Sequence, residues 1–275
     1  MKLARTEYRV MLALLIVLAV SWLLPIFAPN DPLAVSIGAR LSPPDMRNWL
    51  GTDDLGRDVL SRVMHGVSTT VTVSIVALLS SLAIGVAAGG IAGYFYERWP
   101  DKLVMWLADL LTSIPFLVMV AAILSIWGPG LVKAYFVLTA VMWTNSARMV
   151  RAAVIRTLPL DWVTADRAAG FSESRILVRK VLPKCLGPAL IFAVGYLPDI
   201  IGLEAGLSFL GLGIQPPRPG LGKMIFDGIN FIDSAWWVSI APGSALFLVV
   251  LGVMGMTALI GAGAVPLRPR LDQIL

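Results

Sequence analysis

Long stretches of this chain contain no lysine, arginine, aspartate or glutamate, and their length restricts what the chain can fold into. These stretches cover residues 10–30, 63–96, 110–132, 134–147 and 234–267, and a sixth, 185–217, is interrupted only by Asp199 and Glu204. About 20 apolar residues cross a bilayer as a helix. The stretches lack the alternation of barrel strands, and only 14% of the residues are charged, too few for a soluble domain. The sequence therefore predicts an all-α, polytopic membrane protein.

We expect six transmembrane helices, near residues 8–28, 70–95, 104–127, 131–149, 187–212 and 240–263. The fourth is the weakest, because its uncharged part is short and Lys133 must extend to the interface. The N-terminus resembles a secretory signal, with a basic start and an apolar stretch. That stretch has full membrane length, however, and the residues before Pro29 form a poor cleavage site, so we interpret it as a retained first helix.

The distribution of basic residues predicts the orientation. Six spans place both termini on the same side of the membrane. With the N-terminus in the cytoplasm, 15 lysines and arginines lie inside and 7 outside, as the positive-inside rule requires. We therefore expect both termini in the cytoplasm. This topology accounts for the net charge of +5, so membrane lipid is an expected partner and nucleic acid is not.

The chain is expected to divide into an N-terminal part, residues 1–69, and a core permeation part, residues 70–275. The first part holds the first span and an external segment containing LGTDDLGRDVLSRVMHG (50–66). Apolar residues recur there at helical spacing, namely Val59, Leu60, Val63 and Met64, with Arg57, Ser61 and Arg62 on the other face. This pattern suggests a short amphipathic helix at the membrane surface, although on physical grounds alone a simple connector is the favoured interpretation.

Glycine and alanine are concentrated in the second span, at Gly85, Gly89, Gly90 and Gly93 among others, and glycine recurs in the sixth. Small residues allow transmembrane helices to approach closely. The second span is therefore expected to pack tightly inside the protein or at a subunit interface.

The segment 148–186 is the most polar part of the chain, with eight basic and three acidic residues. Asp161 is a plausible N-cap for a helix over 162–169, and Gly170 is well placed to end that helix. A second helix is expected over 172–182, closed by Pro183. A helix–Gly–helix element of this polarity predicts a docking surface for another protein.

No catalytic or metal-binding site is predicted. The chain has no Gly-x-x-x-x-Gly-Lys-Ser/Thr phosphate loop, its one histidine is His65, and its one cysteine is Cys185. No nucleophile, base and acid stand in a recognisable arrangement. We therefore expect no enzyme activity, no metal and no cofactor in this chain.

Three carboxylates lie within or beside the spans: Asp109, Asp199 and Glu204. Such groups are costly in a bilayer, so they either line a transport path or proton relay, or fix helix packing through hydrogen bonds. For Asp109, which precedes Thr112 and the helix-distorting Pro115, packing is the favoured interpretation. For Glu204 both interpretations remain open.

Four motifs together resemble one family: LGTDDLGRDVLSRVMHG (50–66), DLLTSIP (109–115), ARMVRAAVIR (147–156) and GLSFLGLGIQPPRPGLGKMI (206–225). Nearly the whole chain is similar to the permease subunit of bacterial ABC importers of the dipeptide/oligopeptide/nickel class, specifically the second, C-type subunit. The resemblance implies a type I importer permease fold in the inner membrane and half of a translocation path for di- or oligopeptides. Nickel, a metal chelate or another small solute is the alternative cargo, and a proton-coupled secondary transporter is the alternative class.

The resemblance also implies partners and coupling residues. The partners are a second homologous permease, two ATPase subunits that hold ATP and Mg, and a periplasmic or lipid-anchored solute-binding protein. In the family's cytoplasmic loop, the pattern Glu-Ala-Ala-x-x-x-Gly is followed by nine residues and then by the pattern Ile-x-Leu-Pro. The implied ATPase-coupling residues are Asp161, Trp162, Thr164, Ala165, Asp166, Ala169, Gly170, Leu182 and Pro183.

Two departures from the family pattern stand out. Thr164 occupies the position of the glutamate and Asp166 that of the second alanine. The acidic charge has thus moved by two residues, and on a helix it would point in a different direction. Lys180 occupies the isoleucine position. The tail GAGAVPLRPRL (261–271) lacks the acids that relatives carry before their C-terminus.

Overall fold

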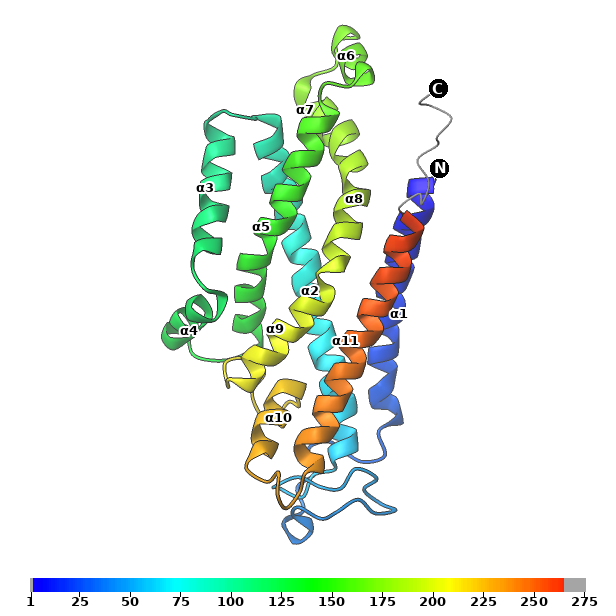
Figure 1. The fold of residues 1–275 in the computed structure, drawn as a ribbon, viewed down its shortest axis with the longest axis vertical. Helices are drawn as coiled ribbons and strands as arrows, with labels where there is room; N and C mark the ends of the chain where they lie inside the picture. The colour runs from blue at the N-terminus through cyan, green and yellow to red at the C-terminus, as the bar shows by residue number, and fades with distance from the viewer. Residues whose placement is uncertain (1, 265–275) are drawn as a thin grey trace, which may run out of the picture.

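The computed structural model describes residues 2–264, as helices arranged along one long axis (Figure 1). The α-helices are α1 Lys2–Leu23, α2 Val59–Tyr94, α3 Trp99–Ser113, α4 Phe116–Trp127, α5 Leu131–Thr157, α6 Asp161–Ala168, α7 Glu173–Ile176, α8 Leu182–Gly195, α9 Leu197–Phe209, α10 Leu221–Ile229 and α11 Trp237–Ala264. Short 3-10 helices cover Leu24–Phe27 and Ile37–Ala39, and a π-helical turn covers Leu177–Val181. Most of the divergent C-terminal tail lies outside the described residues.

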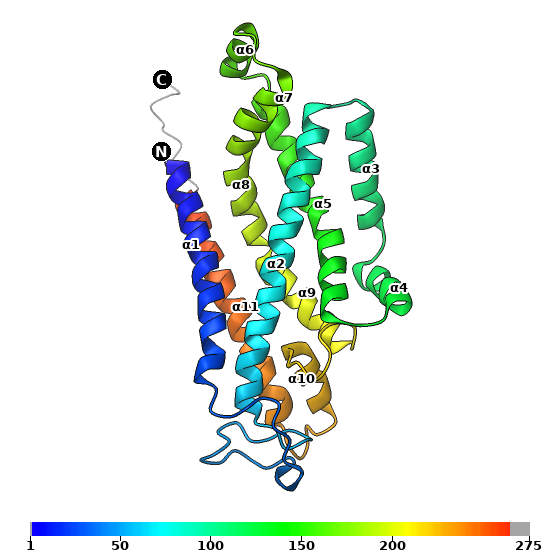
Figure 2. The ribbon, with the colours of Figure 1, turned by 180° about the vertical axis from the view of Figure 1, so that it is seen from behind.

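Within that range, α1, α2 and α11 are each long and apolar enough to cross a membrane. Two further candidate spans are bent pairs, α3 with α4 and α8 with α9. The weakest predicted span corresponds to α5, which lies along α2 and carries charges towards both ends, at Lys133 and Arg148 (Figure 1). The start of α1, the end of α11 and the α6–α7 region lie at one end of the bundle, and α10 lies at the other (Figure 2).

Two predicted spans are not straight helices. The predicted span 104–127 breaks at Pro115, and α4 turns by 90° from α3. Proline excludes the α conformation at the preceding residue, and Ile114 is accordingly extended, with φ −90° and ψ 130°. The predicted span 187–212 corresponds to α8 and α9, which meet at 45° around Tyr196, just before Pro198.

The helix expected over 172–182 also ends differently from the prediction. From α7 the chain continues through the π-helical turn into α8 without leaving the helical region. Pro183 does not close a helix, because it lies in the first turn of α8, directly after the π-helical turn.

The separate amphipathic helix predicted around 58–66 is not formed, because these residues are the first turns of the 36-residue α2. Asp58 caps this helix by accepting a hydrogen bond from the Ser61 N–H at 2.8 Å. Its expected polar face is largely buried, with Ser61 and Arg62 at 0% and 4% exposure. The prediction failed because the external segment folds back over this face and supplies polar partners for it.

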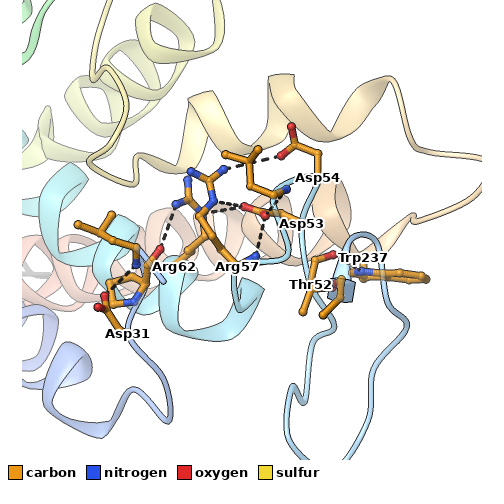
Figure 3. Close-up of polar contacts among 11 residues, drawn as sticks. Asp31, Thr52, Asp53, Asp54, Arg57, Arg62 and Trp237 are labelled. Atoms are coloured by element: carbon orange, nitrogen blue, oxygen red, sulfur yellow. Dashed lines mark hydrogen bonds and ion pairs between the residues drawn. The ribbon is translucent and has the colours of Figure 1, made fainter. Parts of the chain in front are cut away.

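Those partners come mainly from Asp53 (Figure 3). Its carboxylate lies 2.7 Å from Arg57 Nε and 3.3 Å from Arg62 Nε, and it also accepts from two backbone N–H groups of its own loop. Arg62 reaches further to the carbonyl oxygen of Pro32, at 3.2 Å. The neighbouring Thr52 accepts a hydrogen bond at its carbonyl oxygen from Trp237 Nε1, at 3.1 Å. The external segment is thus held to the beginnings of both α2 and α11.

We expect Asp53→Asn to destabilise the protein by about 1–2 kcal/mol, because the amide keeps the loop hydrogen bonds but loses the charge beside the buried Arg62 and the partly buried Arg57. Chemical unfolding of the purified protein measures the change, and proteolysis of the external segment should accelerate. Asp54→Asn is the matched control, since Asp54 is 35% exposed and lies 3.7 Å from Arg57. Equal effects of the two substitutions on stability would contradict the role of Asp53 as the ion-pair partner of the two arginines.

Close helix contact occurs between α2 and α5, as the small residues of the second span predict. A methyl group added at Gly85 would lie 2.3 Å from Ser146 Cβ, and one at Gly89 would lie 2.3 Å from the Ala147 carbonyl oxygen. The glycines of α11 differ, because no neighbouring atom lies within 4 Å of such a group at Gly252 or Gly255. The same small-residue pattern therefore marks close packing in α2 but not in the described surroundings of α11.

Candidate functional site

The element α6–Gly170–α7 protrudes from one end of the bundle, beyond α5 and α8 (Figure 1). The first helix agrees with its predicted bounds to within a residue, but Asp161 begins it instead of capping it, and Leu160 holds the N-cap position without a side-chain hydrogen bond. An acid in the first turn still stabilises the helix through a favourable interaction with the helix dipole. Gly170 ends the helix as predicted: its φ of +81° is a left-handed conformation that favours glycine.

Apolar anchors fix this element to the bundle. Val163 of α6 and Ile176 of α7 are both fully buried. Trp162 lies under the ammonium group of Lys184, 3.5 Å from the ring centroid. Leu182 packs at Gly90 of α2, where an added methyl group would lie 2.8 Å from its Cδ2. Trp162 and Leu182, both implied coupling residues, thus contact their own chain.

Most of the remaining implied coupling residues are exposed on the outside of the element or, for Pro183, at the start of α8. Those exposed to solvent are Asp161, Thr164, Ala165, Ala169, Gly170 and Pro183. Their side chains are mostly small, so the backbone of α6 is accessible to a partner that can approach closely. The outer surface of this element therefore suits insertion into a groove.

Asp166 does not replace the missing glutamate on this outer surface. Its half-buried carboxylate forms an ion pair with Lys180, in the π-helical turn. The same ammonium group lies 4.5 Å from the ring centroid of Phe171. Asp166 and Lys180, which both depart from the family pattern of the loop, are thus linked, because the relocated acid and the new lysine bind each other across the element.

A second polar contact joins the element to α2, and it could not be predicted from sequence spacing. The Tyr94 hydroxyl donates to Glu173 Oε2 at 3.1 Å, and Arg167 Nε donates to Glu173 Oε1 at 2.8 Å. Its hydrogen bond to Glu173 raises the pKa of Arg167 above the ordinary value. A cavity of about 560 Å³ lies beside these residues, between the ends of α2 and α5 and the protruding element. Displacement of α7 can therefore be transmitted to α2 as well as to α8.

The three candidate carboxylates do not meet at one site. Asp109 of α3 lies 2.8 Å from Arg148 Nη2 of α5, and the two side chains are 71% and 40% exposed. Asp199 lines a cavity of about 630 Å³ bordered by α1, α8, α9 and α11. Glu204 is 1% exposed in α9. Among the described residues no group of three histidine, cysteine or acidic side chains could hold a metal ion.

Arginines of α5 make the contacts to α3 that sequence reasoning missed. Arg151 forms two hydrogen bonds with Asp101, at 2.5 and 2.7 Å, and Arg148 also donates to Thr112 at 3.0 Å. Arg148 and Arg151 are three residues apart, which places them on one side of a helix. Two arginines on one side of α5, together with two acids on α3, are the sequence signal that could have identified the contact between these helices.

The comparison with known proteins decides the family. The family described as binding-protein-dependent transport system inner membrane component matches residues 85–264. The chain belongs to this family of ABC importer permeases. The match covers the C-terminal end of α2, from residue 85, and α3 to α11, whereas α1, the external segment and most of α2 precede it.

Named relatives resemble the permease over most of its length. It is 36% identical over 249 residues to the di/tripeptide transport system permease protein DppC of Pseudomonas aeruginosa, covering 88% of this chain and 82% of the relative. It is 38% identical over 249 residues to the dipeptide transport system permease protein DppC of Escherichia coli, covering 88% and 81%. The type I fold is confirmed by an inward-facing structure of the MetNI methionine ABC transporter, with a TM-score of 0.57, 23% identity, and coverage of 74% and 96%.

Membership of this family establishes several of the expectations. The permease is a multi-pass protein of the inner membrane, works with an ATPase and a solute-binding protein, and leaves ATP hydrolysis to separate subunits. The predicted family and the all-α type I permease fold are confirmed.

Proposed function

We propose that this permease forms half of the translocation path of an ATP-driven, binding-protein-dependent importer of di- and oligopeptides. The protruding element α6–Gly170–α7 carries the proposal, because a rigid, outward-facing helix pair is what a partner ATPase needs in order to move the bundle. Relatives named for peptide transport support the cargo. The working unit is this permease, a second homologous one, two ATPase subunits that hold ATP and Mg, and a periplasmic or lipid-anchored solute-binding protein.

In this proposal both termini face the cytoplasm. The start of α1 lies at the same end of the bundle as α6 and α7, where the basic residues of 148–186 are concentrated (Figure 1). The opposite end, with α10 and the external segment, then faces the solute-binding protein. The positive-inside rule supports this orientation.

Closure of the ATPases on ATP would displace α6 and α7, and the contacts of these helices determine where the displacement goes. The π-helical turn joins α7 to α8 without a flexible break. The contact of Glu173 with Tyr94 leads to α2, and Val163 and Ile176 keep the element from moving independently of the bundle. Movement of the element therefore becomes movement of α2 and α8 together.

Uptake by the reconstituted complex tests the proposal. In proteoliposomes containing both permeases, the ATPases and the binding protein, we expect a labelled dipeptide to accumulate only with ATP. Vanadate should abolish accumulation, and a protonophore should leave it unchanged. Excess unlabelled peptide should compete, whereas nickel or a metal chelate should not. Protonophore-sensitive uptake by this chain alone would indicate a secondary transporter, and competition by the metal alone would reassign the cargo.

A further inference from the structure

Glu204 is a buried acidic residue to which the proposed transport cycle gives no role. One carboxyl oxygen, Oε1, accepts a hydrogen bond from Ser208 Oγ at 2.7 Å. Ser208 Oγ in turn accepts the Ile214 N–H at 3.0 Å. A serine hydroxyl has one proton to donate, and here it is directed to Glu204. Oε1 therefore acts as a hydrogen-bond acceptor.

The other oxygen, Oε2, is fully buried and makes no hydrogen bond, and the same is true of Thr70 Oγ1 on α2. The Thr70 side chain nevertheless lies beside this carboxyl group. Among the described residues, no lysine or arginine forms an ion pair with Glu204. A carboxylate with one neutral hydrogen bond and no cation is costly in the interior of a membrane protein.

We propose that Glu204 carries a proton on Oε2 and that the neutral carboxyl group donates it to Thr70 Oγ1, joining α9 to α2. One proton then removes the buried charge and satisfies both unpartnered oxygens. Glu204 is, in this view, a positioning residue and not a proton carrier or a ligand for cargo.

The residues around Glu204 indicate what it positions. Ser208 and Ile214 extend the hydrogen bonds into the turn that follows α9. A methyl group at Gly213 would lie 2.3 Å from Ser208 Oγ, and one at Gly222 of α10 would lie 1.9 Å from the Ala205 carbonyl oxygen. This turn and α10 thus lie against α9 without spare space. The link from Thr70 through Glu204 therefore fixes α10 relative to α2, at the end of the bundle opposite α6 (Figure 1).

Substitutions separate hydrogen bonding from charge. Glutamine can accept from Ser208 and donate to Thr70, so Glu204→Gln should retain uptake within about twofold, whereas Glu204→Leu, of similar size, should lose about tenfold or more. Thr70→Val, like Glu204→Leu, should lower uptake. Comparable amounts of each variant in the membrane, with the ATPases still bound, show that the assembly survives. Failure of Glu204→Gln together with retention by Glu204→Asp would overturn the proposal.

Infrared spectroscopy of the assembled transporter provides a readout that packing alone would not change. The wild-type minus Glu204→Gln difference spectrum at neutral pH should contain the carbonyl band of a protonated carboxylic acid. Carboxylate bands in its place would overturn the proposal. The role in uptake rests on the proposed importer function, but the infrared result does not. If neither the wild type nor any variant imports peptide, the proposed importer function is wrong, but the infrared result still decides whether Glu204 is protonated.

Discussion

We expect that replacing Ala165 by arginine will abolish ATP-driven uptake and leave the permease folded in the membrane. Ala165 lies on the exposed side of α6, so a longer side chain meets no atom of its own chain there. In a partner's groove the same side chain would be buried with its charge. Disrupting a residue at the centre of a small interface costs about 2–4 kcal/mol, which weakens ATPase binding by about 30- to 1000-fold.

Co-purification of the ATPases and uptake in proteoliposomes measure this effect. Ala165→Ser is the conservative control and should behave as wild type. Met46→Arg adds the same charge to a 97% exposed position in the external segment, so ATPase binding should persist. Gly170→Pro should match Ala165→Arg in uptake, because proline cannot adopt the left-handed φ of +81°. Normal uptake and normal ATPase binding by both Ala165→Arg and Gly170→Pro would contradict the docking surface.

Gly89→Ala destabilises the bundle, because the new methyl group meets backbone atoms that no rotamer change can move. It would lie 2.3 Å from the Ala147 carbonyl oxygen and 3.0 Å from the Ala147 Cα, so α2 and α5 must separate. Overpacking of this kind costs about 1–3 kcal/mol. For a protein of this size we expect the loss to lower Tm by about 2–12 °C, measurable by thermal unfolding in detergent.

Gly252→Ala provides the matched control, since the same chemical change in α11 meets no atom within 4 Å. Its Tm should equal or slightly exceed that of the wild type, because alanine favours the helix. Adding Gly85→Ala to Gly89→Ala should reduce the amount of folded protein in the membrane further. Similar Tm values for Gly89→Ala and Gly252→Ala would show that the contact between α2 and α5 is not tight.

Local chemistry made several features predictable. Uninterrupted apolar length identified the spans, and Gly170 identified the end of α6, because few other residues adopt its backbone conformation. Pro115 predicted a distortion between α3 and α4. The glycines of the second span predicted close packing, but only the structure identifies α5 as the partner and shows that Gly252 and Gly255 of α11 have no atom within 4 Å of an added methyl group.

The failed predictions involved tertiary contacts and backbone geometry that sequence spacing does not show. Arg62 seemed to belong to a surface helix, because nothing in the spacing shows that Asp53 folds back onto it. Helical spacing indicated that Asp166 points away from the position of the missing glutamate, but it could not identify Lys180 as the partner of Asp166. Pro183 seemed a terminator, because the π-helical turn that carries the chain into α8 has no clear sequence signature.

The external segment fastens the first turns of α2 and α11 at one end of the bundle, through Arg62 and Trp237. Because their first turns are held together, α2 and α11 can separate only by rotating about this end of the bundle. A force applied from the α6 end would spread their far ends more than their tied ends, so the opening would be wedge-shaped.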